Sequence, residues 1–462
     1  MFVRQFVDEG LGNSSYLVGS EEAKLAVTVD AQRDVDRYVQ VAEGLGLRLA
    51  YAVDTHLHND FVTGALELAA QVGLRVGASA EAQVAFEHIP LHEGDTLDLG
   101  DLTVGVLTTP GHTPEHISFT LTEAGQQTPS AIFTGGALIV GGAARTDLLG
   151  QALAEPLARH LYHTVHDKLL HLHDDVAVYP THGAGSFCAA PAVAERSTTI
   201  GRERQWNRLA QALSEGEFVA QATADLPSYP SYFQHLRRVN QAGPQVLGGV
   251  PVLAPVSLEA IRQKMEQGIA VVDTRTPREF AAGHIRGSYG IPLDAPLITW
   301  VGWVVPFGTP LILIADGPDE REQAVRQLIR IGYDDVRGYV EGDVAAWRSA
   351  GLPVSQVPVL PADELARRLE RTDAPIVLDV RFDAEWRAGH LPRAMHVEAG
   401  RLPAEALPLT PDSPVVVQCG HADRSTVGLS LLERRGYWNL MLLDGGFSSW
   451  QAAGYPVVHD LE

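Results

Sequence analysis

The sequence predicts a chain of several α/β domains, and three observations lead to this class. The 462 residues exceed one ordinary domain and correspond to about three. In roughly the first 190 residues, short apolar runs such as Leu25–Val29 and Ala131–Phe133 alternate with helical patterns such as Asp34–Leu45 and Gly64–Val72. In roughly the last 200, one strand-and-helix pattern occurs twice, which indicates two related domains.

The composition is that of a globular protein with an acidic surface. Hydrophobic residues make up 45% of the chain and charged residues 20%, which is enough to bury real cores. The formal net charge is −22, which disfavours nucleic acid and anionic membranes as partners because both repel a negative surface. A local positive pocket for a small anion remains compatible with this balance.

The beginning of the chain and its cysteines predict a cytoplasmic protein. Residues Met1–Phe6 lack a charged segment followed by an apolar run, and no apolar stretch reaches the roughly 18 residues that cross a bilayer. Cys188 and Cys419 fall in different predicted domains, so each is expected to be a free thiol in a reducing compartment. Cys188 is interpreted as a buried small residue, with a thiol that receives sulfur as the alternative.

The predicted boundaries divide the chain into four segments. Residues 1–190 form a first domain, whose loops carry most of the histidines. Residues 191–257 are a helical extension and linker, in which Ser197–Glu215 has the pattern of an amphipathic helix. Residues 258–355 and 356–462 are the two copies of the repeat.

The two copies match at equally spaced positions. Asp273 and Asp379 each end a buried-strand pattern and stand 106 residues apart, and His284 and His390 are also 106 residues apart. Chance similarity between two α/β segments would not keep matched positions in one order over such a length. Each copy is therefore predicted to be a small α/β domain with a parallel sheet.

Cys419 stands between a predicted strand, Val415–Gln418, and a helical pattern that runs to Arg434. Backbone N–H groups and the helix N-terminus point into such a turn, which binds anions and favours a thiolate. A thiolate there can attack sulfane sulfur and hold it as a persulfide. A lone cysteine after a strand is more often a buried structural residue. Cys419, however, occurs together with other motif segments of the same domain, which favours a catalytic role. The predicted catalytic residues are Cys419 and Arg424, and the anion-binding loop also includes Gly420, His421, Ala422, Asp423 and Ser425.

The second copy resembles a rhodanese domain, because it combines an Asp-x-Arg strand end, a Glu-x-x-x-Gly-His segment and a Cys-x-x-x-x-Arg loop. The resemblance implies a sulfurtransferase that acts on thiosulfate or a persulfide. The first copy has Ala315 opposite Cys419, followed by Asp316, Asp319 and Glu320, which would repel an anionic substrate. The first copy is predicted to be an inactive rhodanese-like domain with a packing or docking role.

Histidines of the first domain occur in three segments, each after a predicted strand and punctuated by Gly or Pro. These segments are Thr55–Asp60, Thr109–His116 and Tyr179–Ser186. They resemble the ordered ligand motifs of the metallo-β-lactamase fold, an αβ/βα sandwich, and together with Asn13–Leu17 they are similar to persulfide dioxygenases. The order of the whole chain resembles the fusions of a persulfide dioxygenase-like domain with two rhodanese domains.

Two positions depart from the motifs that this resemblance implies. Phe61 stands where a second-metal histidine is expected, which disfavours a dinuclear zinc hydrolase. Gly136 stands where the family has the aspartate that completes an iron site of two histidines and one carboxylate. What remains is a prediction of one Fe(II) or Zn per chain, held by three imidazoles. The predicted ligands are His56, His58 and His112, with Asp60, His182 or Asp147 as additional or replacement ligands.

These patterns lead to a hypothesis of sulfane-sulfur metabolism. The second copy would transfer sulfur through a Cys419 persulfide, and the first domain would oxidise a low-molecular-weight persulfide to sulfite with iron and dioxygen. Sulfite could then accept the Cys419 sulfur and form thiosulfate. Two alternatives stay open, a metal-dependent thioester hydrolase like glyoxalase II and a sulfur-carrier or sensor scaffold with a metal-free first domain. The resemblance also implies a homo-oligomer, and it leaves the thiol substrate and the direction of sulfur transfer open.

Overall fold

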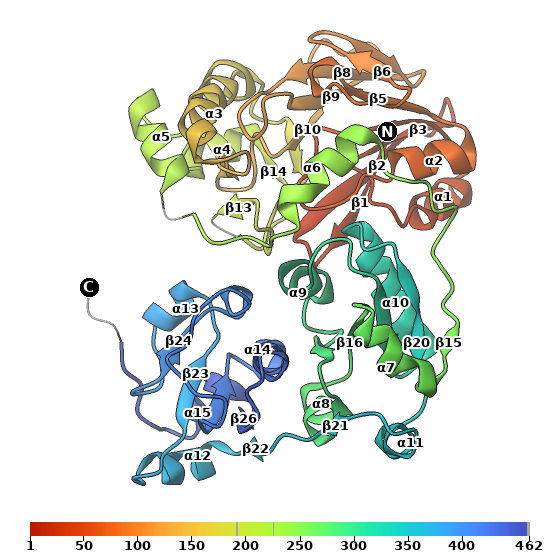
Figure 1. The fold of residues 1–462 in the computed structure, drawn as a ribbon. Helices are drawn as coiled ribbons and strands as arrows, with labels where there is room; N and C mark the ends of the chain where they lie inside the picture. The colour runs from red at the N-terminus through yellow and green to blue at the C-terminus, as the bar shows by residue number, and fades with distance from the viewer. Residues whose placement is uncertain (191–192, 225, 460–462) are drawn as a thin grey trace. The chain divides into compact units, whose positions relative to one another are not determined.

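The computed structural model describes residues 1–190, 193–224 and 226–459 (Figure 1). Contacts group the chain into two compact units. The first consists of Met1–Pro251 and Ile329–Gly332, and the second of Val252–Leu328 and Tyr333–Glu462. The extension predicted after residue 190 is therefore part of the first unit as far as Pro251.

The first unit contains two six-stranded sheets. In the first sheet the strands follow chain order, with antiparallel pairing from β1 to β3 and parallel pairing from β3 to β6. In the second sheet the order is β14-β12-β10-β9-β8-β7, and the β10–β12 pair is parallel while the other neighbours are antiparallel. The strands of the two sheets are β1 (Phe2–Asp8), β2 (Asn13–Ser20), β3 (Leu25–Val29), β4 (Arg48–Val53), β5 (Arg75–Ser79), β6 (Ile89–Leu91), β7 (Thr96–Asp98), β8 (Leu102–Thr108), β9 (Ile117–Glu123), β10 (Ala131–Gly135), β12 (Ala177–Pro180) and β14 (Thr198–Thr199).

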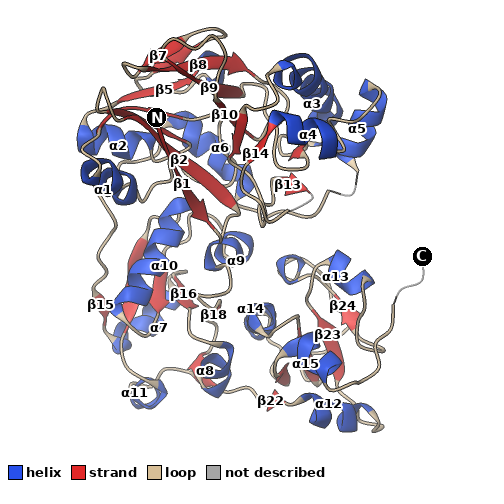
Figure 2. Ribbon diagram, turned by 180° about the vertical axis from the view of Figure 1, so that it is seen from behind, coloured by secondary structure: helices blue, strands red, loops and turns tan. Residues whose placement is uncertain are grey.

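Helices cover the outer faces of both sheets, which gives the four layers of an αβ/βα sandwich (Figures 1 and 2). Helices α1 and α2 pack on the first sheet, and α3, α4 and α5 pack on the second. The remaining elements of the unit are α1 (Asp36–Gly44), α2 (Ala65–Val72), η1 (Ala80–Ala82), β11 (Ala143–Ala144), α3 (Gln151–His163), η2 (Thr164–Lys168), η3 (Leu169–His171), β13 (Ala189–Ala190), α4 (Ile200–Trp206), α5 (Glu215–Thr223) and α6 (Phe233–Ala242).

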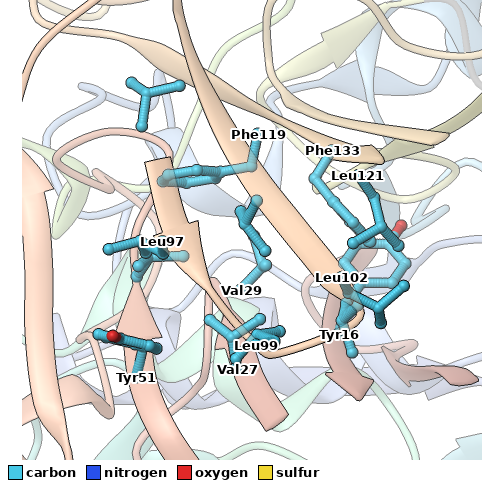
Figure 3. Packing of buried hydrophobic residues seen from close by; sticks show 14 of the residues in the cluster. Tyr16, Val27, Val29, Tyr51, Leu97, Leu99, Leu102, Phe119, Leu121 and Phe133 are labelled. Atoms are coloured by element: carbon cyan, nitrogen blue, oxygen red, sulfur yellow. The ribbon is translucent and has the colours of Figure 1, made fainter. Parts of the chain in front are cut away.

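The main core lies between the two sheets (Figure 3). Alternate residues of a strand point to opposite faces of its sheet, so one strand serves two layers. In β10, Phe133 points into the inter-sheet core, while Ile132 packs against the helices on the outer face. In β3, Val27 and Val29 point inward and Ala26 faces α1 and α2. This alternation assigns the residues of each strand either to the inter-sheet core or to the contact with the helices.

The single helix predicted over Ser197–Glu215 is wrong in its length, because α4 covers only Ile200–Trp206 and the next helix, α5, begins at Glu215. The buried Asn207 ends α4, and its Oδ1 accepts hydrogen bonds from the amides of Leu209 and Ala210. An asparagine that bonds neighbouring backbone amides competes with helix continuation. Ser214 then caps α5 by accepting a hydrogen bond from the amide of Glu217.

The second unit contains the two copies of the repeat, each built on a five-stranded sheet whose neighbouring strands are parallel. The predicted parallel sheets are therefore confirmed. The first copy is β15 (Pro255–Val256), α7 (Leu258–Glu266), β16 (Ala270–Asp273), α8 (Pro277–Ala282), β17 (His284–Ile285), β18 (Tyr289–Gly290), α9 (Leu297–Val304), β19 (Leu311–Ile314), α10 (Pro318–Arg330), β20 (Val336–Val340), α11 (Val344–Ser349) and β21 (Val354–Ser355). The second copy is β22 (Val359–Leu360), α12 (Ala362–Leu369), β23 (Ile376–Asp379), α13 (Asp383–Arg387), β24 (Met395–His396), η4 (Ala399–Arg401), β25 (Val415–Gln418), α14 (Asp423–Arg434), β26 (Leu440–Leu443) and α15 (Gly446–Ala452).

A helix that crosses a bilayer needs about 20 residues, most of them apolar. None of the helices in the described part of the chain is both long enough and apolar enough to cross a membrane.

Candidate functional site

The three histidine segments of the first unit meet at one end of its sheets. The first follows β4, the second connects β8 to β9, and the third follows β12. Their histidine side chains are all at most 4% exposed, although histidine carries two polar nitrogens that must be satisfied when buried. The buried histidines are His56, His58, His112, His116 and His182.

His56, His112 and His182 bring ligand nitrogens to within 4.8 Å of one another. The Nε2 atoms of His56 and His182 are 3.4 Å apart. Two nitrogens bound at about 2.0–2.1 Å in tetrahedral geometry would be separated by about 3.4 Å. The donor set therefore fits a divalent cation such as zinc or iron.

The Nδ1 atoms of His56 and His112 form hydrogen bonds with neighbouring protein atoms. The hydroxyl of Thr55 donates to Asp30 at 2.8 Å, so its oxygen accepts from Nδ1 of His56 at 2.9 Å. Nδ1 of His112 donates to the carbonyl of Arg145 at 2.6 Å. Partners of this kind fix the tautomer of a metal ligand, and they leave Nε2 of His56 and His112 as the ligand atoms.

Burial sets the charge of these imidazoles. Burial, together with the neighbouring histidines, lowers the pKa of His56 and His116 well below the ordinary range, and burial lowers the pKa of His112 to about 3. All three rings are thus neutral near pH 7, the state in which imidazole binds a metal.

His116 is close to the cluster but differs from it in its hydrogen bonds. The ring stacks on His56 with centroids 4.9 Å apart. Its Nε2 accepts a hydrogen bond from the amide of Gly136 at 3.0 Å, and its Nδ1 donates to Thr109 at 2.9 Å. Both nitrogens are engaged by the protein, so His116 braces the site rather than offering a ligand atom.

His58, the third predicted ligand, lies in a different environment. Its Nε2 is 3.2 Å from a carboxylate oxygen of Asp30, and its ring stacks on Phe61 with centroids 4.0 Å apart. Burial opposes a charge on this ring, but the Asp30 carboxylate outweighs burial and raises the pKa of His58. The donor groups that include His58 are His58 with Asp60 and His182, and His58 with Asp30 and Asp54. The structure thus gathers His56 and His112 with His182 in one group, and His58 in others.

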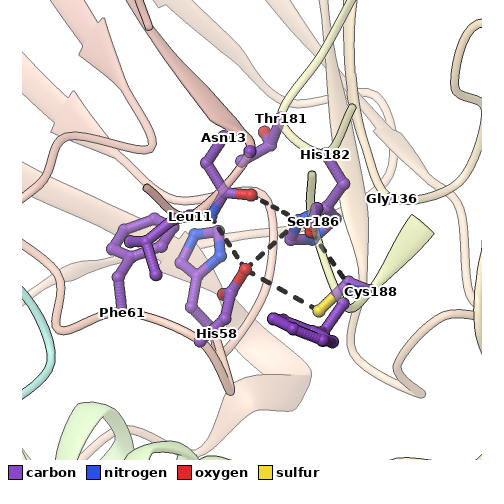
Figure 4. A network of polar contacts seen from close by, with 12 residues as sticks. Leu11, Asn13, His58, Phe61, Gly136, Thr181, His182, Ser186 and Cys188 are labelled. Carbon is purple, nitrogen blue, oxygen red and sulfur yellow. Dashed lines mark hydrogen bonds and ion pairs between the residues drawn. The ribbon is translucent and has the colours of Figure 1, made fainter. Parts of the chain in front are cut away.

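Asp60 lies in a buried polar network that reaches Cys188. Figure 4 shows Asn13, His182 and Cys188, which belong to this network. One of its oxygens accepts from the side-chain amide of Asn13 at 2.8 Å and lies 3.4 Å from Nδ1 of His182. The Cys188 thiol donates to the same oxygen at 3.7 Å. Burial, reinforced by Asp60, raises the pKa of Cys188, which keeps the thiol protonated and favours the interpretation as a buried small residue.

Helix α6 of the extension covers the loop that carries His56 and His58, and no sequence pattern predicted this cover. The side-chain amide of Asn240 donates to the carbonyls of His58 and Phe61, at 2.8 and 2.9 Å. Arg237 forms a bidentate ion pair with the buried Glu115, both distances being 2.8 Å. This bidentate ion pair fixes the position of α6 relative to the loop that carries Glu115. The two residues are 122 positions apart, so no local sequence pattern could predict that they pair.

Gly136 has no room for a side chain. A Cβ atom there would lie 2.5 Å from Cδ2 of His112 and 2.9 Å from Cβ of Ala144. The ring of His112 therefore occupies the space that an aspartate would need, and a carboxylate at this position requires His112 to move.

A Gly136→Ala variant is expected to destabilise the first unit by about 1–3 kcal/mol, because overpacking a buried site forces backbone or side-chain shifts. Denaturant unfolding of the full chain measures the change. Gly44→Ala is the matched control, since a Cβ at this exposed helical residue meets nothing within 4 Å and should cost no stability. If the two variants were equally stable, the conclusion that Gly136 has no room for a side chain would be contradicted.

Cys419 follows β25 and precedes α14, as the sequence predicted. The residue is 1% exposed, and its sulfur accepts a hydrogen bond from the amide of Ala422 at 3.3 Å. Ala422 adopts a left-handed conformation with φ of 93°, uncommon for a residue with a side chain, and stands directly before the first residue of α14. The amides of Phe447 and Ser448 donate to the carbonyls of Cys419 and Gly420, at 2.6 and 3.1 Å, and hold the loop in place.

Arg424 braces the loop of Cys419 through a bidentate ion pair with Glu385. Burial would lower the pKa of Arg424, but Glu385 and the neighbouring Cys419 raise it, so the guanidinium stays charged. The other predicted loop residues differ in accessibility. His421 is exposed and bonds Ser448 at 3.1 Å, Asp423 is partly buried, and the buried Ser425 hydroxyl has no partner among the described residues.

The first copy of the repeat has Ala315 directly after β19, at the position that corresponds to Cys419. The next residue, Asp316, has a raised pKa because of burial and of the nearby Glu279, while Arg275 opposes the shift. The loop is therefore a locally acidic environment.

An Ala315→Cys variant in a Cys419→Ser background is expected to leave sulfurtransferase activity at background. The carboxylates around residue 315 disfavour a thiolate, so the new thiol should titrate at or above about 8.5. The pH dependence of alkylation by iodoacetamide measures this value. A thiol that titrates well below the ordinary range would contradict the electrostatic explanation.

Comparisons with known proteins cover both units. Residues 257–350 and 361–453 each match the family described as rhodanese-like domain. The mitochondrial persulfide dioxygenase ETHE1 of Homo sapiens is 31% identical over 198 residues, which are 43% of this chain and 74% of that protein. The hydroxyacylglutathione hydrolase GloC of Haemophilus influenzae is 28% identical over 210 residues, which are 40% of this chain and 88% of that protein.

Similarity to one solved structure extends over most of the chain. The crystal structure of a metallo-beta-lactamase from Staphylococcus aureus has a TM-score of 0.68 and 30% identity, and the match covers 74% of this chain and 99% of that chain. The predicted fold class, a metallo-β-lactamase sandwich followed by two rhodanese-like domains, is confirmed.

Proposed function

Because the chain belongs to the persulfide dioxygenase family and carries two rhodanese-like domains, we propose that it combines two activities on sulfane sulfur. The second rhodanese-like domain is a sulfurtransferase that works through a Cys419 persulfide. The first unit is a metal-dependent domain that oxidises a low-molecular-weight persulfide to sulfite. The observation that carries the proposal is the position of Cys419, a thiol at a strand-to-helix turn with a backbone amide directed at its sulfur.

Sulfur transfer follows from the chemistry of this loop. The Cys419 thiolate attacks the outer sulfur of thiosulfate, an S–S bond forms, and the original S–S bond breaks as sulfite leaves with the electron pair. A second nucleophile then attacks the outer sulfur of the Cys419 persulfide and restores the thiolate. The amide of Ala422 and the N-terminal end of α14 stabilise the anionic sulfur in each state. Arg424 adds positive charge and, through Glu385, keeps the loop in place.

The first unit supplies a donor set that fits iron or zinc in His56, His112 and His182. A bound divalent iron would supply the reactivity toward dioxygen that converts one persulfide, one dioxygen and one water to one thiol, one sulfite and two protons. The site is buried, since all three imidazoles are at most 4% exposed. Sulfite from this reaction can accept the Cys419 sulfur and form thiosulfate, which links the two units chemically. Sulfur transfer needs Cys419 as a free thiol, and the proposal therefore places the chain in the reducing cytoplasm.

A thioester hydrolase is the second candidate, and the 28% identity to the hydroxyacylglutathione hydrolase GloC favours it. A binuclear hydrolase site would need two complete donor sets. The two histidine-rich groups here, His56 with His112 and His182 and His58 with Asp60 and His182, share His182. One shared imidazole leaves each group short of a full set, which favours a single cation.

The test is the transfer of sulfur to Cys419 in the full chain. After incubation with thiosulfate, intact-mass and peptide mass spectrometry should find one additional sulfur atom on Cys419, and later addition of cyanide should remove it as thiocyanate. A persulfide that forms elsewhere, or none at all, would overturn the sulfurtransferase assignment.

A further inference from the structure

We propose that the third metal ligand of the first unit is His182 rather than His58, and that Asn13, together with Asp60, positions this ligand. The inference rests on the proposed metal-dependent function and names the residues that would hold the cation. It assigns to Asn13 a positioning role.

The ring of His182 is held by two neighbouring oxygen atoms. Its Nδ1 lies 3.2 Å from the side-chain oxygen of Asn13 and 3.4 Å from a carboxylate oxygen of Asp60. Both oxygens only accept hydrogen bonds, so Nδ1 carries the proton and Nε2 has a free lone pair.

Nε2 of His182 faces Nε2 of His56. Nε2 of His56 also has a free lone pair, because Nδ1 of His56 donates to Thr55. The two Nε2 atoms are 3.4 Å apart, and two lone pairs directed at each other repel. A cation between them turns this repulsion into two favourable bonds, and Nε2 of His112 is available to complete the set.

Backbone contacts place Asn13 beside His182. The start of β2 pairs with the loop after β12 through a backbone bridge between Asn13 and His182 and a hydrogen bond from the amide of Ser14 to the carbonyl of Thr181. Gly12 makes this approach possible, since a Cβ there would lie 2.1 Å from the amide nitrogen of Ser186. The side-chain amide of Asn13 then holds both partners, donating to Asp60 at 2.8 Å while accepting from His182 (Figure 4). A metal ligand that is hydrogen-bonded to a second residue keeps its orientation in the absence of the metal.

His58 is excluded by its own contacts. Its Nε2 faces Asp30, and Phe61 covers one face of its ring, as Figure 4 also shows. Among the described residues, no group of converging donors contains His58 together with His56 and His112. A set of three neutral imidazoles leaves the full charge of a divalent cation uncompensated, which favours an anionic persulfide as the substrate.

The experiment measures binding of cobalt(II) to the metal-stripped full chain by titration, with the ligand-field absorption as the readout. The variants are His182→Ala, His58→Ala and Asn13→Ala, and Thr113→Val is the matched control. Thr113 lies in the loop of His112, is fully buried, and its hydroxyl has no partner among the described residues, so the isosteric Val should leave binding unchanged.

His182→Ala is expected to lose the ligand-field band of the wild type, whereas His58→Ala should keep the band. Asn13→Ala should weaken cobalt binding by about 10–100-fold, the usual cost of removing a residue that orients a metal ligand. Circular dichroism checks that each variant folds, and His182→Gln and His58→Gln replace any alanine variant that does not.

The outcomes separate the inference from the function on which it rests. If the wild type binds no divalent cation, the proposed metal-dependent function fails. If the wild type binds cobalt but His58→Ala abolishes the band and His182→Ala preserves it, the function stands and the ligand assignment is overturned. If Asn13→Ala binds as tightly as Thr113→Val, Asn13 has no positioning role.

Discussion

Cys419→Ser is expected to reduce sulfur transfer from thiosulfate to cyanide by at least about a thousandfold, because a hydroxyl does not form the persulfide intermediate. The fold should remain intact, since the substitution changes one atom in a loop held by the amides of Phe447 and Ser448. Steady-state formation of thiocyanate measures the rate. An unchanged melting temperature of the variant would show that the activity is lost because the thiol is missing and not because the protein unfolds.

Cys188→Ser is the matched control for this experiment. Cys188 is the other free cysteine, is equally buried and belongs to the first unit, whereas Cys419 belongs to the second. The control should keep the wild-type rate of sulfur transfer. Substantial transfer by Cys419→Ser, or its loss in Cys188→Ser, would mean that the nucleophile has been assigned to the wrong thiol.

The same variant also tests the chemical link between the two units. When the wild type is supplied with cysteine persulfide and dioxygen, one persulfide donates its outer sulfur to Cys419 and leaves as cysteine. Sulfite that the first unit forms from another persulfide should then attack the outer sulfur of the Cys419 persulfide, restore the thiolate and leave as thiosulfate. Cys419→Ser lacks the sulfur-carrying thiol, so sulfite should accumulate in place of thiosulfate. Ion chromatography of the two anions distinguishes the cases, and unchanged thiosulfate in the variant would rule out this coupling.

Removal of the metal is the second change with a large expected effect. Treatment of the full chain with a chelator should reduce dioxygen consumption with cysteine persulfide by at least about a hundredfold, because the oxidation depends on the cation. Sulfur transfer from thiosulfate to cyanide should be unaffected, since Cys419 and its loop contain no metal ligand of the histidine cluster. An oxygen electrode and the thiocyanate assay measure the two activities on the same sample.

Metal removal should also lower the stability of the first unit. A cation present at 100 times its dissociation constant stabilises the folded state by about 2.7 kcal/mol, so its loss should move the unfolding transition of that unit to lower temperature. Restored iron should recover both stability and dioxygen consumption. Full dioxygen consumption by protein shown to be free of metal would contradict the assigned role of the histidine cluster.

Features that depend on neighbours along the chain could be predicted from the amino-acid sequence. The strand-turn-helix pattern around Cys419 corresponds to β25 and α14, and the repeat predicted two parallel sheets. Strand and helix periodicity, turn residues and a repeated pattern are local properties, so a single sequence contains them. The early end of the helix predicted over Ser197–Glu215 was missed because Asn207 interrupts an otherwise helical pattern through its own side-chain hydrogen bonds.

Tertiary structure decided which of the candidate donors converge. The motifs placed His56, His58, His112 and His182 near one site, but the pairing of His182 with Asn13, 169 positions earlier in the chain, depends on how β2 meets the loop after β12. Likewise, the cover of α6 over the His58 loop depends on Asn240, 182 positions away. Such contacts follow from strand register and layer packing, which set the position of every side chain in a loop and leave no mark in the residues next to it.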